Sequence, residues 1–230
     1  MIDFHCHVLP QIDDGAQSAE ESVEMLLSLK NQGITTVVAT PHYKGQCSVE
    51  EFLKRRQESY EILCRYALSV GADLPEILLG AEVALETYTT LESSISKLCI
   101  EGTKTLLIEM PFSFWNVYMF EALHNIADNY GLQLLIAHVD RYYSLFGNKK
   151  QNQQILSFSD EGYVVQINTP SLAYRSGRKL LKKLVSNNAK IVFGSDCHNM
   201  VSRKPAFDKY ADVVKANCNM AVVDGKLKKI

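Results

Sequence analysis

Two histidines stand two residues apart near the start of the sequence, in the segment His5-Cys6-His7. Apolar and polar residues alternate around them, which is the period of a β-strand, so both imidazoles point to the same side. Two imidazoles on one face of a strand can chelate a single metal ion. The polar turn that follows offers further carboxylates, among them Asp14. An isolated His-x-His is more often a pair of surface histidines, so the interpretation depends on the rest of the chain.

Seven segments have the composition of buried strands, and mostly helical segments separate them. The predicted strands are short apolar runs at residues 2–8, 34–40, 77–83, 105–109, 132–138, 163–168 and 190–196. Helices are predicted at residues 18–32, 50–70, 116–130, 150–161, 177–188 and 205–216, with a short helix and a turn over 87–103. Continuous apolar strands are buried on both faces, as in a parallel sheet.

The alternation predicts an α/β fold in which residues 1–230 form one domain, a closed or nearly closed (β/α)7 barrel. An open doubly wound sheet is the alternative, because the sequence does not show closure. The polar residues 224–230 are predicted to be frayed.

Composition limits the class of protein. The net charge of −2 argues against a nucleic-acid binder that works through a general basic field. No apolar run approaches the length of a bilayer and no signal peptide is recognisable, so we expect a cytoplasmic protein without membrane insertion. The six cysteines are scattered without a Cys-x-x-Cys motif, and we expect reduced thiols.

Histidines and acidic residues recur at or just after the carboxyl ends of the predicted strands. In a parallel barrel these ends share one rim, where barrel enzymes have their active sites. Burying a charge there is costly unless the charge is paired or bound to a metal, and the repetition favours a metal cluster over satisfied core residues. His124, in the middle of a predicted helix, is expected to be a surface or packing residue. The predicted metal ligands are His5, His7, Asp14, His42, Glu82, Glu109, His138, Asp196 and His198.

Nine nitrogen and oxygen ligands exceed what one ion can bind, so the sequence predicts two or three divalent ions, with Mn²⁺, Fe or Zn²⁺ all compatible. Such a site typically serves hydrolysis, and three ions against four carboxylates leave a cationic centre suited to a phosphate dianion. Arg141 could bind phosphoryl oxygens in bidentate fashion, its alternative being a surface ion pair with Asp140 or a neighbouring acid. Arg203 and Lys44 are further candidates for substrate binding, and Lys44 could instead be solvated.

Six motifs contain these residues and follow one another along nearly the whole chain. They are Phe4-His-Cys-His-Val-Leu-Pro with Asp13-Asp14-Gly15, Thr40-Pro-His42, Gly80-Ala-Glu82, Leu107-Ile-Glu109, Ala137-His138 with Arg141-Tyr142, and Ser195-Asp196-Cys-His198-Asn199. This set resembles the PHP (polymerase and histidinol phosphatase) superfamily, and more narrowly its bacterial protein tyrosine phosphatases of the CpsB/CapC type.

The resemblance implies a distorted (β/α)7 barrel with a trinuclear, usually manganese-dependent site. It also implies dephosphorylation of a phosphotyrosine-bearing protein, the C-terminal tail of a bacterial tyrosine kinase that controls capsule and exopolysaccharide synthesis. Carried onto this chain, the nine residues above are the ligands and Arg141 holds phosphate.

The chain departs from the family pattern in three places. The usual Ala-His-Pro-Glu-Arg-Tyr is here Ala137-His-Val-Asp-Arg141-Tyr142, and Tyr43 and Lys44 replace a common histidine and arginine. The segment after Asn168 lacks the usual phenylalanine-glycine. These changes bear on substrate preference more than on chemistry.

The expected mechanism is in-line attack on phosphorus by a hydroxide that bridges the metal ions, without a phosphoenzyme. Arg141, His42 and Asp196 are the residues expected to act in catalysis, and no general acid is assigned. Three alternatives remain: a phosphatase of histidinol phosphate or another small phosphomonoester, a metal-dependent nuclease, and a non-catalytic module that binds its kinase.

A fourth alternative is a cysteine-dependent phosphatase, because Cys197 and Arg203 have the Cys-x5-Arg spacing of that class. The loop of that class binds phosphate through backbone N–H groups and favours glycine, and no glycine lies between these two residues. We interpret the spacing as a coincidence.

Overall fold

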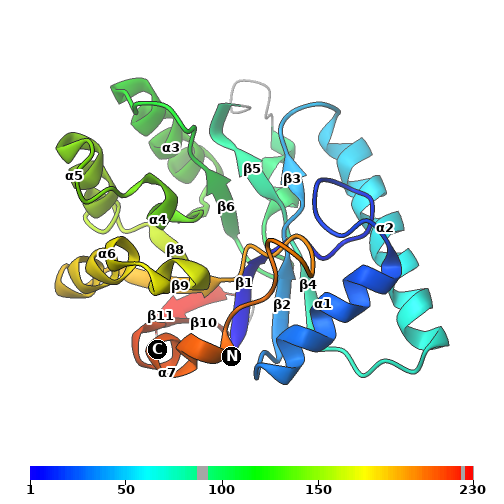
Figure 1. Cartoon of the computed structure of the whole chain (residues 1–230). Coiled ribbons are helices and arrows are strands. Elements are labelled where there is room, and N and C mark those ends of the chain that lie inside the picture. The colour runs from blue at the N-terminus through cyan, green and yellow to red at the C-terminus, as the bar shows by residue number, and fades with distance from the viewer. Residues whose placement is uncertain (87–92, 224–225, 230) are drawn as a thin grey trace.

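The computed structural model describes residues 1–86, 93–223 and 226–229. Parallel strands form the wall of a barrel, and helices lie outside it (Figure 1). The strands of the wall are β1 (Ile2–Cys6), β2 (Thr36–Ala39), β3 (His42–Tyr43), β4 (Glu76–Leu79), β5 (Glu82–Ala84), β6 (Thr105–Glu109), β7 (Gln133–Ile136), β8 (Val164–Asn168) and β9 (Lys190–Gly194).

Two parallel sheets make up this wall, one in the order β1-β2-β4 and the other in the order β3-β5-β6-β7-β8-β9. The two sheets are joined because β3 follows β2 along the chain and β5 follows β4, so each of these pairs forms one interrupted strand of the wall. The remaining gap is closed where Cys6 forms a parallel bridge with Cys197. Backbone hydrogen bonds support this seam: His7 N–H donates to Cys197 O at 3.0 Å, and Asp196 N–H donates to His5 O at 2.8 Å. The wall therefore has seven strands when each interrupted strand is counted once. The predicted closed barrel is confirmed, rather than the open sheet.

Two of the predicted strands are interrupted. The segment 34–40 was expected to be one strand, but the ladder stops after β2 and resumes at β3, beyond Pro41. The segment 77–83 is likewise divided between β4 and β5, with Gly80 N–H donating to Ala39 O at 2.8 Å. The interruption changes the position of the functional side chains, because His42 and Glu82 become direct partners in the β3–β5 register.

Helices connect most of these strands: α1 (Ala19–Asn31), α2 (Val49–Ser69), α3 (Val117–Tyr130), α4 (Val139–Tyr142), α5 (Lys149–Ser157), α6 (Arg175–Ser186) and α7 (Ala211–Asn217). The start of α1 follows the predicted capping box, since the Ser18 hydroxyl accepts from Glu21 N–H and the Glu21 carboxylate accepts from Gln17 N–H. None of the helices in the described ranges is both long and apolar enough to cross a membrane.

Some predicted helix bounds are wrong. The helix expected from 205 begins at Ala211, after a 3₁₀ turn at Asp208–Tyr210, and α5 ends at Ser157 rather than at 161. The short α4 was not predicted. Of the expected short helix and turn over 87–103, residues 87–92 lie outside the described residues, and Ser93–Leu98 form a 3₁₀ helix.

The end of the chain is ordered where fraying was expected. Strands β10 (Met220–Val223) and β11 (Lys226–Lys229) form an antiparallel hairpin, while residues 224, 225 and 230 lie outside the described residues. Leu227 is buried and belongs, with Met220, to the apolar cluster that fills the barrel interior around Phe4. Burial of that one leucine explains why a polar-looking tail forms a strand.

Candidate active site

The structure brings all nine predicted residues to the carboxyl-terminal rim of the barrel. His5 lies on β1, and His7 and Asp14 lie in the loop after it. The other residues begin β3 and β5, end β6, or follow β7 and β9. The exceptions to deep burial are Asp14, whose side chain is 66% exposed at the outer edge, and the partly buried His42 and Glu109. The buried members are His5, His7, Glu82, His138, Asp196 and His198.

Glu82 is at the centre of this cluster. Its Oε2 lies 3.3 Å from His5 Nε2, 3.4 Å from His7 Nε2 and 2.9 Å from His42 Nδ1. Its Oε1 lies 2.8 Å from His138 Nε2. Burial would raise the pKa of Glu82, but the charge of His5 and the hydrogen bonds from its histidine neighbours hold that pKa well below its ordinary value. Glu82 is therefore an ionised carboxylate.

Several buried atoms of the cluster make no hydrogen bond in the described part of the chain, among them His42 Nδ1, Glu82 Oε2 and His198 Nε2. His42 Nδ1 and Glu82 Oε2 lie only 2.9 Å apart but are not aligned for a hydrogen bond. Buried polar atoms are nearly always paired, so this arrangement requires another explanation. His198 Nδ1 lies 3.1 Å from Asp196 O and donates to it, which leaves a lone pair on Nε2. Imidazole nitrogens and carboxylate oxygens that converge in this way, some of them without hydrogen-bond partners, fit divalent cations.

Ligand atoms of eight of the nine predicted residues fall into three groups in which every atom lies within 4.8 Å of the others, and His138 belongs to none of these groups. Each group mixes imidazole with carboxylate, and His7 and His42 each belong to two groups, so neighbouring ions would share ligands. The groups are His7, Asp14, His42 and His198; His5, His7 and Asp196; and His42, Glu82 and Glu109.

Two of the predicted residues have strained backbones. His138 has a φ of 29° and Asp196 a φ of 51°, in the region that side chains other than glycine rarely adopt. Such strain costs on the order of 1–3 kcal/mol per residue and collects at functional sites. Each residue begins the turn that leaves a barrel strand, so the strain aims its side chain into the cluster.

Gln166 was missed by the sequence analysis, although it holds several members of the cluster. Its Oε1 lies 3.0 Å from His5 Nδ1 and accepts from His138 N–H at 2.6 Å. Its Nε2 donates to Asn168 Oδ1 at 2.8 Å, and Asn168 in turn donates to Asp196 Oδ2 at 2.9 Å. An amide oxygen can only accept, so His5 Nδ1 carries a proton and its Nε2 faces the cluster. The available signal was a glutamine inside a fully buried strand.

Asp13, rather than its neighbour Asp14, has the inward position in the loop after β1. Its Oδ2 lies 2.7 Å from His7 Nδ1 and accepts from His42 N–H at 3.0 Å. Burial disfavours a charged His7, but Asp13 and Glu82 more than offset this and raise the pKa of His7 to about 10. Gly15 is required by the same loop, because a Cβ there would lie 2.3 Å from His7 O. The adjacent aspartates in the sequence did not show which of them points inward.

Arg141 and Arg203 both contact Asp196. The Arg141 guanidinium contacts Asp196 Oδ2, and Arg203 Nη2 lies 2.7 Å from Oδ1. Arg141 therefore does form an ion pair with an acid, as the alternative interpretation expected, but the acid is the buried Asp196. Asp140 instead accepts from Asn168 N–H at 2.7 Å. The two arginines remain about one-third exposed and line a cavity of about 500 Å³ beside the cluster.

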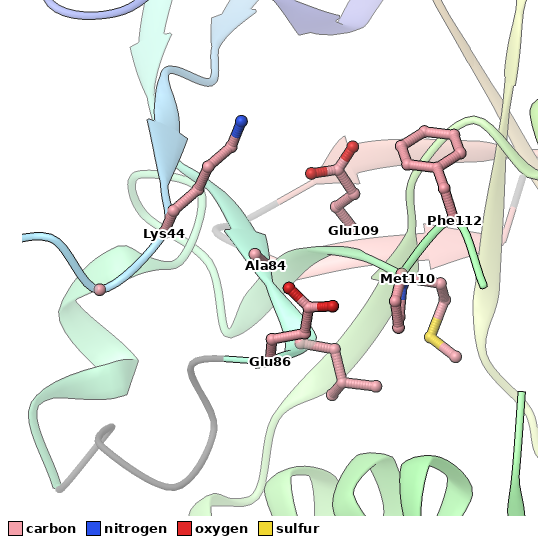
Figure 2. Close-up of a pocket in the computed structure, with 9 residues that line it drawn as sticks. Lys44, Ala84, Glu86, Glu109, Met110 and Phe112 are labelled. Carbon is pink, nitrogen blue, oxygen red and sulfur yellow. The ribbon is translucent and has the colours of Figure 1, made fainter.

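Lys44 is remote from the two arginines. It lines a second cavity, of about 430 Å³, together with Glu86, Glu109 and Phe112. Figure 2 shows Lys44 and Phe112 on either side of the Glu109 carboxylate. His124, expected to be a surface residue, lies outside the cluster and contacts Glu161 at 2.8 Å.

Cys197 does not have the surroundings of a phosphatase nucleophile. It is fully buried, and its Sγ lies 3.0 Å from Cys6 Sγ at the barrel seam. Arg203 lines the cavity beside the cluster, whereas Cys197 is not among the residues that line it. The geometry agrees with interpreting the Cys-x5-Arg spacing as a coincidence.

The sequence profile described as "Capsular polysaccharide synthesis, CpsB/CapC" matches residues 1–227. The chain belongs to the CpsB/CapC family. It is 31% identical over 211 residues to the tyrosine-protein phosphatase YwqE of Bacillus subtilis, covering 88% of this chain and 79% of YwqE. It is 30% identical over 229 residues to the tyrosine-protein phosphatase CpsB of Streptococcus pneumoniae, covering 93% of this chain and 89% of CpsB.

The fold agrees with that membership. The chain superimposes with a TM-score of 0.74, at 29% identity, on a structure from a study of YwqE from Bacillus subtilis and CpsB from Streptococcus pneumoniae. That study describes both as unique metal-dependent tyrosine phosphatases, and the match covers 94% of this chain and 86% of that one. The family resemblance drawn from the six motifs is thereby confirmed.

Proposed function

We propose that this CpsB/CapC-family protein is a metal-dependent protein tyrosine phosphatase that acts in capsular or exopolysaccharide synthesis. The observation that supports this most directly is the convergence of buried imidazole and carboxylate atoms on Glu82, several of them without hydrogen-bond partners, beside two arginines. The activities named for YwqE and CpsB support the same conclusion.

We propose two to three divalent ions in this cluster, with Mn²⁺ as the first choice and Fe or Zn²⁺ as alternatives. The mixed nitrogen and oxygen donors without thiolate favour these ions. When bound, such ions supply an activated water and neutralise charge on the transferred phosphoryl group. The proposed ligands are the nine residues predicted from sequence: His5, His7, Asp14, His42, Glu82, Glu109, His138, Asp196 and His198.

Arg141 and Arg203 are proposed to bind the equatorial oxygens of the substrate phosphoryl group. The Arg141 guanidinium contacts Asp196 Oδ2, and Arg203 Nη2 lies 2.7 Å from Asp196 Oδ1. The N–H donors of both arginines are thus already directed at a pair of oxygens. A phosphoryl group offers the same planar pattern of acceptors. Partial exposure of both side chains lets them turn from Asp196 to a substrate. Arg141, His42 and Asp196 are the residues we assign to catalysis.

We propose the C-terminal tail of a bacterial tyrosine kinase as the physiological substrate and the cytoplasm as the compartment. The family description links the chain to capsular polysaccharide synthesis.

The test is hydrolysis of a phosphotyrosyl peptide by chelator-treated protein before and after Mn²⁺ is restored. We expect activity only with the metal, its loss in His42→Ala and Arg141→Ala, and its retention in Cys197→Ser, the control for the cysteine mechanism. Activity that ignores the chelator and disappears with Cys197 would overturn the proposal. Faster hydrolysis of histidinol phosphate than of any phosphotyrosyl peptide would assign the site to small phosphomonoesters instead.

A further inference from the structure

Two cavities lie beside the cluster, and their charges differ. The first is lined by Arg141, Arg203 and Lys204. Its carboxylates, Asp140 and Asp196, are engaged by the Asn168 amide and by the two arginines. A phosphoryl dianion therefore finds available donors on that side of the cluster.

The second cavity favours a different part of the substrate. Glu109 in its lining is committed to the proposed metal site, and the charges of Lys44 and Glu86 offset each other, so this cavity lacks the excess of cations that would hold a dianion. The remaining lining is mostly apolar: Ala84, Leu85, Met110, Pro111 and Phe112, with Gly45. Its volume of about 430 Å³ lies in the range of small-molecule sites. If the phosphoryl group binds on the arginine side, only the esterified group of the substrate is left to occupy this second cavity.

Phe112 forms one wall of the second cavity. Its ring is stacked on the His138 ring, with centroids 5.9 Å apart and planes 20° apart, and it also contacts the Tyr142 ring at 5.2 Å. The Tyr142 hydroxyl is anchored by donating to Met110 O at 2.6 Å. Phe112 is nevertheless 66% exposed. The ring is thus supported on one side and open to the cavity on the other (Figure 2).

We propose that Phe112 is a specificity residue that selects aryl phosphate esters over alkyl ones by stacking on the tyrosyl ring of the substrate. The inference rests on the proposed phosphatase function and deepens it. The phosphoryl contacts are common to phosphotyrosine, phosphoserine and phosphothreonine, whereas only phosphotyrosine brings a ring to the second cavity. An aromatic contact of this kind accounts for up to about tenfold in affinity.

Non-hydrolysable phosphonates test this stacking without a leaving-group effect. The measurement is calorimetric binding of benzylphosphonate and methylphosphonate to the Mn²⁺-loaded protein. In Phe112→Ala we expect benzylphosphonate to bind about tenfold more weakly, while methylphosphonate changes by less than about twofold. Phe112→Tyr keeps the ring and is expected to restore the preference. Phe114→Ala is the matched control, because Phe114 is 75% exposed but lines neither cavity.

Equal weakening of both phosphonates in Phe112→Ala would overturn the inference, because it would show that Phe112 only supports His138. An unchanged benzyl-to-methyl ratio would also overturn it. Hydrolysis of a phosphotyrosyl peptide by the same wild-type preparation separates the two failures. With that hydrolysis present, an unchanged ratio refutes only the role of Phe112; absence of hydrolysis and of binding to either phosphonate refutes the proposed function as well.

Discussion

Replacing Gln166 with methionine tests whether the barrel interior sets the orientation of the metal-ligating residues. The change keeps the length of a fully buried side chain but removes its amide. It leaves His5 Nδ1, His138 N–H and Asn168 Oδ1 without the partners they have now. Each buried group left unpaired costs about 1–3 kcal/mol, and neighbouring losses do not add fully. We therefore expect the free energy of unfolding to fall by about 3–5 kcal/mol.

The same substitution should weaken metal binding. Without the Gln166 acceptor, the His5 ring can turn or place its proton on Nε2, the atom that faces the cluster. Loss of such a partner behind a ligand typically lowers metal affinity 10- to 100-fold. Two assays check the prediction: denaturant unfolding of chelator-treated protein, and calorimetric titration with Mn²⁺.

Gln133→Met is the matched control for Gln166→Met. Gln133 lies on β7 at the far end of the barrel, where its Oε1 accepts from Thr105 Oγ1 at 3.2 Å. Losing that hydrogen bond should cost about 1 kcal/mol and leave Mn²⁺ affinity unchanged. A Gln166→Met protein that is destabilised but binds Mn²⁺ normally would refute the claim that Gln166 fixes the ring of His5.

Three further predictions concern other parts of the site. Gly194→Ala would place a Cβ 2.7 Å from His5 Cβ, so we expect denaturant unfolding to show that the free energy of unfolding falls by about 1–3 kcal/mol. Gly80→Ala is the control, because the nearest atom to its Cβ would be 3.4 Å away. Equal losses in the two variants would contradict the steric argument. In chelator-treated protein, neighbouring carboxylates more than offset burial and raise the pKa of His7 to about 10 and of His138 to about 9. Their contribution to stability is therefore complete below the unfolded value of about 6.5 and is lost as the pH rises through 9–10; thermal unfolding at pH 6.5 and 9 should show the decrease, and a rise would count against it. Arg141→Ala should lower kcat/KM for a phosphotyrosyl peptide by about 10²–10³, whereas Lys44→Ala should change it by less than about threefold because an exposed charge contributes little; similar losses in steady-state assays would place Lys44 with the arginines.

The sequence predicted those features of the site that have a local signature. Apolar runs that end in His or acidic residues, such as the one before Glu109 and the one before His138, were sufficient to place those side chains on one rim. Gln166 was missed because its partners are distant in sequence or are backbone groups, which leave no pattern in the chain. Asp13 was missed because two adjacent aspartates do not show which carboxylate turns toward His7 and the backbone of His42. A ladder that is broken after Ala39 and restored at His42 likewise depends on neighbouring strands.

The hairpin at the end of the chain was mispredicted for a related reason. Lys226 and Lys228 flank a single leucine, so composition suggests a solvated tail. The stabilising contact is the burial of Leu227, together with Met220 of the same hairpin, in the cluster around Phe4 of β1. Tertiary packing therefore overrides local polarity there.

The seam between Cys6 and Cys197 has a consequence for folding during synthesis. Strand β1 can pair with β2 as soon as residues 36–39 emerge from the ribosome, but its other edge has no partner until the residues after β9 appear. At about 5–20 residues per second, the roughly 190 residues between the two cysteines take about 10–40 s to synthesise. During that interval the nascent chain carries an open strand edge next to two histidines, an arrangement prone to wrong pairing and to premature capture of metal ions. Pairing of the last strand of the wall, β9, with β1 is therefore expected to be the step at which this protein depends most on chaperones.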